Sequence, residues 1–218
     1  MKKLIGLLAA GLLPAVLAWG QVPPEVYYLL PDFGQGMVYF SDQRPAQGKM
    51  NICAEDQSLR YLDNDGQELA SKADNITRVM IDTVVFVRDD GFFHRIYPVA
   101  DEVSVALRRS VDIQRDAKKG AYGTVSRTSA IREVGSFRSE EGVVYKLEKA
   151  DDYPYNVTET CFIYKEGSVI PFNKRNLRKH FPARKDDIDA WLKAGHTLPK
   201  TLDDTRAFLA RLSSGETL

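Results

Sequence analysis

The stretch DEVSVALRRSVDIQR, residues 101–115, alternates apolar and polar side chains, and this period of two predicts a long, half-buried β-strand. Its apolar face carries Val103, Val105, Leu107, Val111 and Ile113. Arg109 alone interrupts that face. We expect a β-bulge at Arg109, which is the commonest cause of such a break; a functional arginine at a sheet edge is the alternative.

Turns that combine acidic residues with glycine divide the surrounding sequence into shorter strands. Asp65-Gly66 and Asp90-Gly91 each lie between apolar runs, and Glu141-Gly142 and Glu166-Gly167 predict two later hairpins. Glycine supplies the positive φ that tight hairpin turns need. The glycine after Asp63 and Asp65 comes two positions too early for an EF-type calcium loop, so turn chemistry explains this cluster. We predict an antiparallel meander, sandwich or roll over about residues 34–172.

A long segment, residues 116–142, separates the two groups of strands and is rich in glycine, serine, threonine and charge. It is far longer than the median connection of about 4 to 6 residues in compact domains. Loops of this length are either functional or loosely ordered, and both readings stay open. Tyr122, within GAYG, is the candidate residue for contact with the core or with a partner.

After Pro171 the apolar spacing changes to that of helices. Asn173 is placed to cap a first helix, with Phe172 before the cap and Leu177 within the second turn, a hydrophobic-staple arrangement. Leu177 and Phe181 then share one face with His180. This first helix is expected to dock on the strands through Leu177 and Phe181.

Two more helices are expected before the end of the chain. The second carries Ile188, Trp191 and Leu192 on its apolar face. The third begins at Thr201, with Asp204 completing a capping box, and ends at Gly215. Its inward residues are Leu202, Thr205, Leu209 and Leu212. The predicted fold class is therefore α+β, with a β-rich body over residues 21–172 and a helical tail of two or three helices over residues 173–218 packed on it.

A basic cluster covers the outer face of the first predicted helix. It consists of Lys174, Arg175, Arg178 and Lys179. Lys174 and Arg175 lie in the first turn, where the helix dipole disfavours cations by about 0.3 to 1 kcal/mol each. An anion held by these side chains would explain their position; a solvated helix face is the simpler interpretation.

The first twenty residues predict a signal peptide. Lys2 and Lys3 precede an apolar run that is too short and too broken to span about 30 Å of hydrocarbon. Ala18 and Gly20 place small side chains where a signal peptidase reads them, which predicts cleavage between Gly20 and Gln21. Cleavage after Ala18 and an uncleaved membrane anchor are the alternatives. We expect an exported protein, in the periplasm or at the cell surface.

Charge and compartment narrow the class of partner. Without Lys2 and Lys3, 28 basic residues stand against 30 acidic ones, a net charge near −2. Such a chain has no global field to attract nucleic acid. We therefore expect no nucleic-acid partner and at most a peripheral membrane association; an envelope protein or an anionic glycan are the candidate partners.

Cys53 and Cys161 are the two cysteines of the chain. Export would allow them to form a disulfide, and a bridge that closes so long a loop would stabilise the fold by about 4 to 5 kcal/mol in the chain-entropy model. The alternative is that each is a small apolar residue buried in a strand.

No motif in the sequence assigns a catalytic residue, a metal site or a cofactor. The histidines are His94, His180 and His196, and none lies at a metal-ligand spacing. His94 alternates with Phe92 and Ile96, which indicates a half-buried strand residue rather than a general base. There is no G-x-S-x-G nucleophile motif and no phosphate-binding loop.

The stretches KGAYG, residues 119–123, and FNKRNLRKHFP, residues 172–182, carry a resemblance over most of the mature chain. The chain resembles a group of uncharacterised exported proteins of Bacteroidota. This resemblance implies an exported protein with a β-rich body and a helical tail. It implies no reaction and no catalytic residue.

These observations favour a non-enzymatic exported protein that acts in binding or envelope assembly. One alternative is a hydrolase of envelope polymers, with acidic residues or His94 near residues 116–142. Another is an anionic glycan or lipid-headgroup binder that uses the basic cluster of the first predicted helix.

Overall fold

The computed structural model describes residues 24–113, 117–119, 125–127, 136–139, 142–145 and 155–218. Its centre is one ten-stranded antiparallel sheet with the strand order β14-β13-β8-β7-β6-β5-β1-β2-β3-β4. Along the chain its strands are β1 (Gly34–Phe40), β2 (Ala46–Ile52), β3 (Leu59–Leu62), β4 (Glu68–Ser71), β5 (Ile76–Ile81), β6 (Val84–Asp89), β7 (Phe92–Ala100), β8 (Val103–Ile113), β13 (Tyr155–Lys165) and β14 (Ser168–Pro171). The predicted α+β class with an antiparallel sheet is confirmed.

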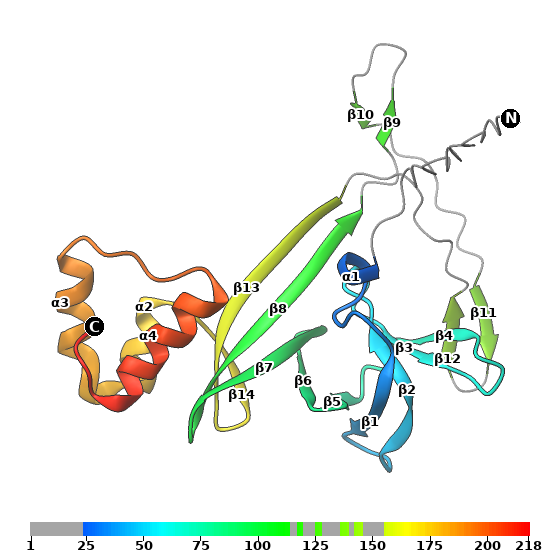
Figure 1. Ribbon diagram of the computed structural model, residues 1–218, viewed down its shortest axis with the longest axis horizontal. Helices are drawn as coiled ribbons and strands as arrows, with labels where there is room; N and C mark the ends of the chain where they lie inside the picture. Colours follow the sequence, from blue (N-terminus) through cyan, green and yellow to red (C-terminus); the bar gives the residue numbers. More distant parts are fainter. Residues whose placement is uncertain (1–23, 114–116, 120–124, 128–135, 140–141, 146–154) are drawn as a thin grey trace, which may run out of the picture.

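Three helices follow the sheet, and a short one precedes it. They are α1 (Pro24–Tyr27), α2 (Lys174–His180), α3 (Lys185–Lys193) and α4 (Leu202–Ser214), with a 3₁₀ turn, Pro182–Arg184, between α2 and α3. Figure 1 shows α2, α3 and α4 gathered at one end of the molecule and strands β1 to β4 at the other, with the long β8–β13 pair between them. The predicted helical tail is therefore confirmed.

The long strand predicted from residues 101–115 is β8, and its pairing with β13 is continuous. Register runs from Val103 opposite Lys165 to Ile113 opposite Tyr155 without a shift. The bulge expected at Arg109 is therefore wrong. Arg109 instead lies opposite Glu159, with its Nε 3.8 Å from Glu159 Oε1, so a cross-strand ion pair accommodates the charge on a half-buried face.

The tight turns follow the predicted chemistry. Asp90 and Gly91 both have positive φ, 48° and 78°, and Glu166 and Gly167 have 53° and 77°. Two consecutive left-handed residues give the turn twist that joins adjacent antiparallel strands. At the earlier turn, the Asp63 carboxylate accepts the backbone N–H groups of Asp65 and Gln67 at 2.9 and 2.8 Å, so this acid organises its own turn.

The described residues of the segment over residues 116–142 belong to short strands, so this part of the chain is more regular than its sequence indicated. Strands β9 (Ala117–Lys119) and β10 (Val125–Arg127) form one hairpin. Strand β11 (Ser136–Ser139) pairs with β12 (Gly142–Tyr145), which confirms the hairpin predicted at Glu141-Gly142. Backbone pairing rather than side-chain alternation defines these strands, and for that reason the periodicity missed them. Tyr122 lies outside the described residues.

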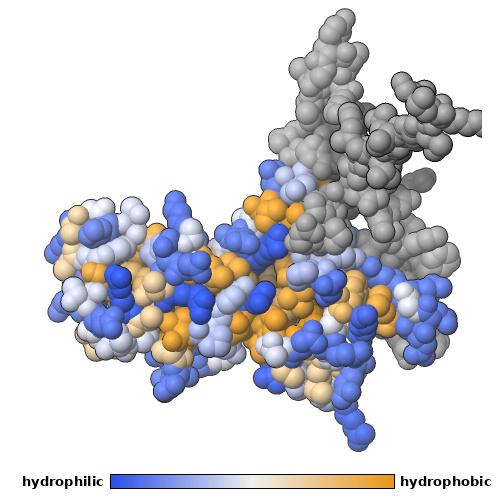
Figure 2. Space-filling view, in the orientation of Figure 1, coloured by the Kyte–Doolittle hydropathy of each residue, from blue (hydrophilic) through white to orange (hydrophobic). Residues whose placement is uncertain are grey.

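Two main clusters of apolar side chains form the core. The first lies under the C-terminal helices and consists of Val103, Val105, Leu107, Cys161, Ile163, Ile170, Leu177, Phe181, Ile188, Phe208, Leu209 and Leu212. The second lies among the early strands and consists of Leu30, Val38, Met50, Ile52, Leu59, Ile76, Val79, Ile81, Phe86 and Phe93. Helix α4 packs directly on β7 and β8. The tail is thus fixed to the sheet by a shared apolar core, and Figure 2 shows hydrophilic side chains spread over the helical end on this face of the molecule.

The helix ends use the caps that the sequence indicated. The Asn173 side chain accepts the N–H of Asn176 at 2.9 Å, and the Thr201 hydroxyl accepts the N–H of Asp204 at 3.3 Å. Gly215 ends α4 in the left-handed conformation, with φ of 83°. Within the described residues, none of the helices is long and apolar enough to cross a membrane.

Candidate functional site

The structure gathers the predicted basic cluster around one surface hollow. The hollow has a volume of about 520 Å³ and is lined by Lys174, Arg175, Arg178, Lys179 and Lys185. Four of these residues come from α2, and Lys185 begins α3. We call this site the basic hollow. The sequence predicted the α2 cations; it did not predict Lys185, because only the turn at Pro182–Arg184 brings the start of α3 back to α2.

Helix α2 turns its cations outward because its apolar residues are buried. Leu177 is fully buried, and Phe181, directly after the helix, is 9% exposed. Lys174, Arg175 and Lys179 are exposed, and Arg178 is half-buried. The Asn173 side chain accepts the N–H of Asn176 and so satisfies one N–H group at the start of α2, while the side chains of the lining residues bring five cations to the hollow.

One acidic residue of α3 organises part of the basic hollow. Asp189 Oδ1 lies 2.8 Å from Lys174 Nζ, and Asp189 Oδ2 lies 3.6 Å from Arg178 Nη2. The hydrogen bond from Lys174 lowers the pKa of the Asp189 carboxyl, and the charges of Arg178 and Lys174 act in the same direction. Asp189 therefore stays ionised and holds two of the five cations in place.

The other three cations are available to a ligand. Within the described part of the chain, Arg175, Lys179 and Lys185 form no ion pair. Clustered cations without a counter-charge attract anions, and guanidinium and ammonium groups bind phosphate and carboxylate oxygens. Asp189 offsets part of the five positive charges, and a net positive charge remains in the basic hollow. The hollow is therefore suited to hold an anionic group of more than one charge.

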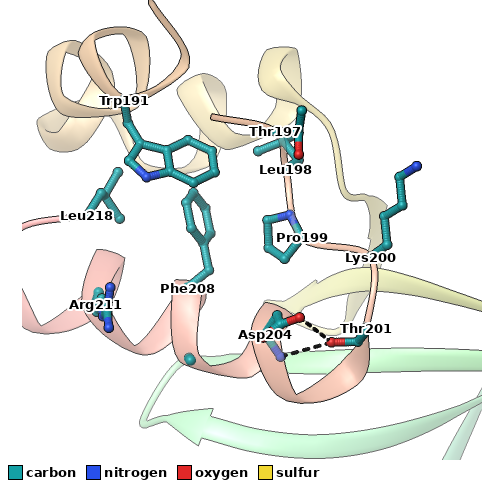
Figure 3. Close-up of a pocket in the computed structure, with 11 residues that line it drawn as sticks. Trp191, Thr197, Leu198, Pro199, Lys200, Thr201, Asp204, Phe208, Arg211 and Leu218 are labelled. Carbon is teal, nitrogen blue, oxygen red and sulfur yellow. Dashed lines mark hydrogen bonds between the residues drawn. The ribbon is translucent and has the colours of Figure 1, made fainter. Parts of the chain in front are cut away.

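A second hollow, of about 580 Å³, lies between α3, α4 and the segment that joins them. Figure 3 shows Trp191 and Phe208 facing one another, with Leu198 and Pro199 on one side and Leu218 on the other. The tail therefore carries two hollows of different character, one cationic and one largely apolar.

A buried charged cluster near the start of the sheet was missed by sequence reasoning. Arg60, on β3, is 1% exposed, and its Nη2 lies 3.0 Å from Asp56 Oδ2. Burial alone would raise the pKa of Asp56, but the hydrogen bond from Ser58 and the charges of Arg60 and Lys72 outweigh it and lower that pKa. An arginine in a short strand usually faces solvent, so the sequence carried no signal for this burial.

Cys53 and Cys161 are both free and buried, so the disulfide considered from the sequence is not formed in this structure. Cys161 lies in the core cluster beneath the helices, whereas Cys53 faces Tyr28 through an isolated bridge beside β2. Burial raises the pKa of the Cys53 thiol to about 11, and the nearby Asp56 charge adds to this effect. Cys161 is therefore a small apolar residue buried in a strand, as the alternative interpretation expected, whereas Cys53 lies just after β2 and interacts with Asp56 and the buried Arg60.

His94 is a residue of strand β7, as expected, but it is buried rather than half-buried, because Phe162 of β13 also packs against its ring. It is 2% exposed, and its ring packs edge-on against Phe162 with centroids 4.9 Å apart. Burial lowers the pKa of His94 although Asp89 opposes this effect, and Arg108, its cross-strand neighbour, lowers it further. His180 is half-buried, and His196 stacks on Trp191.

In the residues that the structure describes, His, Cys, Asp and Glu form no group of three or more that could hold a metal ion. Gly20 and Gln21, the predicted cleavage position, lie outside those residues. Comparison with known protein families, with curated proteins and with solved structures finds no match to this chain.

Proposed function

We propose that this chain is an exported, non-enzymatic binding protein of the cell envelope that holds an anionic glycan in the basic hollow. The observation that carries the proposal is the gathering of five cations around one concavity of about 520 Å³, three of them without an ion pair among the described residues. The signal-peptide pattern of residues 1–20 and the resemblance to exported proteins of Bacteroidota support the compartment.

The lining of the hollow favours a glycan over a membrane surface. All five lining residues are cationic, and the apolar residues of this region, Leu177 and Phe181, point into the core. Membrane-surface helices combine cations with apolar side chains that enter the bilayer. A concave site lined only by Lys and Arg residues instead fits discrete carboxylate, sulfate or phosphate groups along a soluble polymer.

The geometry of His94 argues against the version of the hydrolase alternative in which His94 is the general base. A general base must reach the proton that it removes, and His94 is 2% exposed with its ring held against Phe162. Burial also lowers the pKa of His94 and so favours its neutral form, which packs in the sheet. For these reasons we assign no catalytic residue.

The test is binding of the full chain to a polyuronate, measured by titration calorimetry at low and physiological salt. The double variant Arg175→Gln/Lys179→Gln removes two exposed cations of the hollow. Its matched control, Arg44→Gln/Lys49→Gln, removes the same charge from exposed positions of the β1–β2 region. We expect the hollow variant to lose affinity and the control to retain it, with weaker binding at higher salt.

Two outcomes would overturn this proposal. Equal losses in both double variants would show that net charge rather than the basic hollow drives binding. Tight binding to vesicles that contain phosphatidylglycerol, without binding to the polyuronate, would assign the hollow to lipid headgroups.

A further inference from the structure

The second hollow of the tail has apolar walls supplied by three separate segments. Helix α3 contributes Trp191, the connecting segment contributes Leu198 and Pro199, and α4 contributes Ala207 and Phe208. Figure 3 shows Trp191, Pro199 and Phe208 around one space, with Leu218 on its far side. We call this site the Trp191 hollow. Its volume of about 580 Å³ lies within the range of about 300 to 1,000 Å³ typical of small-molecule sites.

The aromatic rings of the Trp191 hollow act as walls. His196 stacks on Trp191 with centroids 5.0 Å apart and an interplanar angle of 18°, and Phe208 packs at 5.1 Å with a tilt of 54°. His196 covers one face of the Trp191 indole from outside the hollow, and the residues that line the hollow beside Trp191 include Leu198, Pro199 and Phe208. The hollow therefore offers apolar surface to a flexible apolar group.

The polar residues around the Trp191 hollow leave positive charge available. Asp204 accepts the Thr201 hydroxyl at 2.7 Å and is committed to the cap of α4. Lys200 and Arg211 are exposed, and neither forms an ion pair within the described residues. The occupant that complements an apolar space with cations at its border carries an apolar body and a negative head.

We propose that the Trp191 hollow binds an anionic amphiphile, a single alkyl chain with a carboxylate headgroup. The chain lies against Trp191, Leu198 and Phe208, and the headgroup meets Arg211 at the border. This site is separate from the basic hollow, because the two share no lining residue. Binding here is independent of the proposed glycan function.

Trp191 is itself the reporter for the test. The only other tryptophan of the sequence is Trp19, so Trp191 is the sole tryptophan of the full chain with Trp19→Phe. Dodecanoate, titrated below its micelle concentration, should change Trp191 emission saturably, with one molecule bound per chain by calorimetry. Decanoate and octanoate should bind progressively more weakly, by about fourfold for each methylene removed. Dodecyltrimethylammonium, with the opposite charge, should bind much more weakly.

Two variants test whether dodecanoate binds in the Trp191 hollow or elsewhere on the surface. Ala207→Phe places a large side chain at an exposed position that lines the hollow and should abolish dodecanoate binding. Ala183→Phe, at an exposed position that does not line the hollow, is the matched control and should bind as the parent does. Arg211→Gln should weaken dodecanoate binding without affecting binding of an uncharged dodecyl glycoside.

The proposal fails if dodecanoate gives no saturable change, if Ala207→Phe binds as tightly as the control, or if the cationic amphiphile binds as well as dodecanoate. A parent dimer that Ala207→Phe dissociates in sedimentation measurements would overturn it as well, since the hollow would then belong to a second copy of the chain.

Discussion

Lys174 on α2 and Asp189 on α3 form an ion pair, with Nζ and Oδ1 2.8 Å apart, and this pair links the two helices that border the basic hollow. Asp189 also lies 3.6 Å from Arg178, so one carboxylate restrains two lining cations. The same carboxylate competes with any anion that enters the hollow. Asp189 therefore both positions the site and limits its charge.

Asp189→Asn should tighten anion binding. The substitution keeps the side-chain shape but removes the negative charge, which frees Lys174 and Arg178 for a ligand. We expect the affinity for a polyuronate to rise by roughly two- to fivefold, the effect that an exposed ion pair typically carries, with a steeper salt dependence. Calorimetry at two salt concentrations measures both. Weaker binding would mean that the positioning role of Asp189 outweighs its competition with the ligand.

Asp56→Asn should destabilise the early part of the sheet. It leaves the buried Arg60 without its partner at 3.0 Å, although Glu68 Oε1 remains 3.9 Å from Arg60 Nη1. We expect a loss of roughly 2 to 3 kcal/mol in the free energy of unfolding, measured in urea.

The same variant should also change the acid sensitivity of the fold. Because the folded-state pKa of Asp56 is lowered, its contribution is complete above the unfolded value of about 3.9 and is lost as the pH falls through the lower folded value. Asp56→Asn should therefore lose less stability than the parent below about pH 4. An unchanged acid dependence would contradict this role of Asp56.

His94→Phe should reduce the change in the free energy of unfolding between neutral and mildly acidic pH. Burial lowers the folded-state pKa of His94, so the unfolded chain takes up its proton first. The parent is then fully stabilised above about pH 6.5 and loses stability as the pH falls through the lower folded value. Urea unfolding at pH 7 and pH 5 should show a smaller difference for the variant. Equal differences in both proteins would place the pH dependence elsewhere.

The two cysteines should be free thiols that react slowly with reagents in the folded chain. Cys53 is fully buried with its pKa raised to about 11, and Cys161 is 8% exposed with a pKa that burial also raises. A thiol-specific reagent should react slowly with the folded chain. In concentrated guanidinium it should react rapidly with both thiols of each chain. Absence of both thiols in denaturant, without added reductant, would show that the exported chain forms the disulfide.

Leu177→Ala should loosen the helical tail. Leu177 is fully buried in the cluster shared by α2, α4 and the sheet, so its truncation leaves a cavity. We expect a loss of about 3 kcal/mol in the free energy of unfolding. Leu192→Ala, at a half-buried position of α3, is the control and should cost clearly less. Similar small losses in both variants would contradict tight docking of α2.

The parts of the structure that followed from sequence depend on nearby residues. The caps at Asn173 and Thr201 each use groups within three residues of one another, and the inward positions Leu177, Leu209 and Leu212 follow from helical spacing. Strand β8 was visible because one of its faces is buried at every position except Arg109. Local geometry and burial pattern were sufficient for these elements.

Errors arose where a residue depends on a distant partner. Arg109 broke an apolar pattern and suggested a bulge, yet Glu159, fifty positions later in the chain, pairs with it across an undistorted register. Arg60 lies only four residues from its partner Asp56, but the sequence did not show that Arg60 is buried, because its burial depends on the surrounding strands. The short strands at residues 117–127 rest on backbone pairing that leaves little trace in side-chain pattern.

For this protein, the sequence alone determined the elements: an amphipathic strand, capped helices and a basic face on α2, all of which follow from interactions between residues a few positions apart. Tertiary structure alone decided which elements meet. It brought Lys185 to the α2 cations, placed Asp189 beside Lys174, and enclosed the space around Trp191. Those contacts depend on how α3 and α4 pack against the sheet, and packing is set by the shapes of side chains from distant parts of the chain.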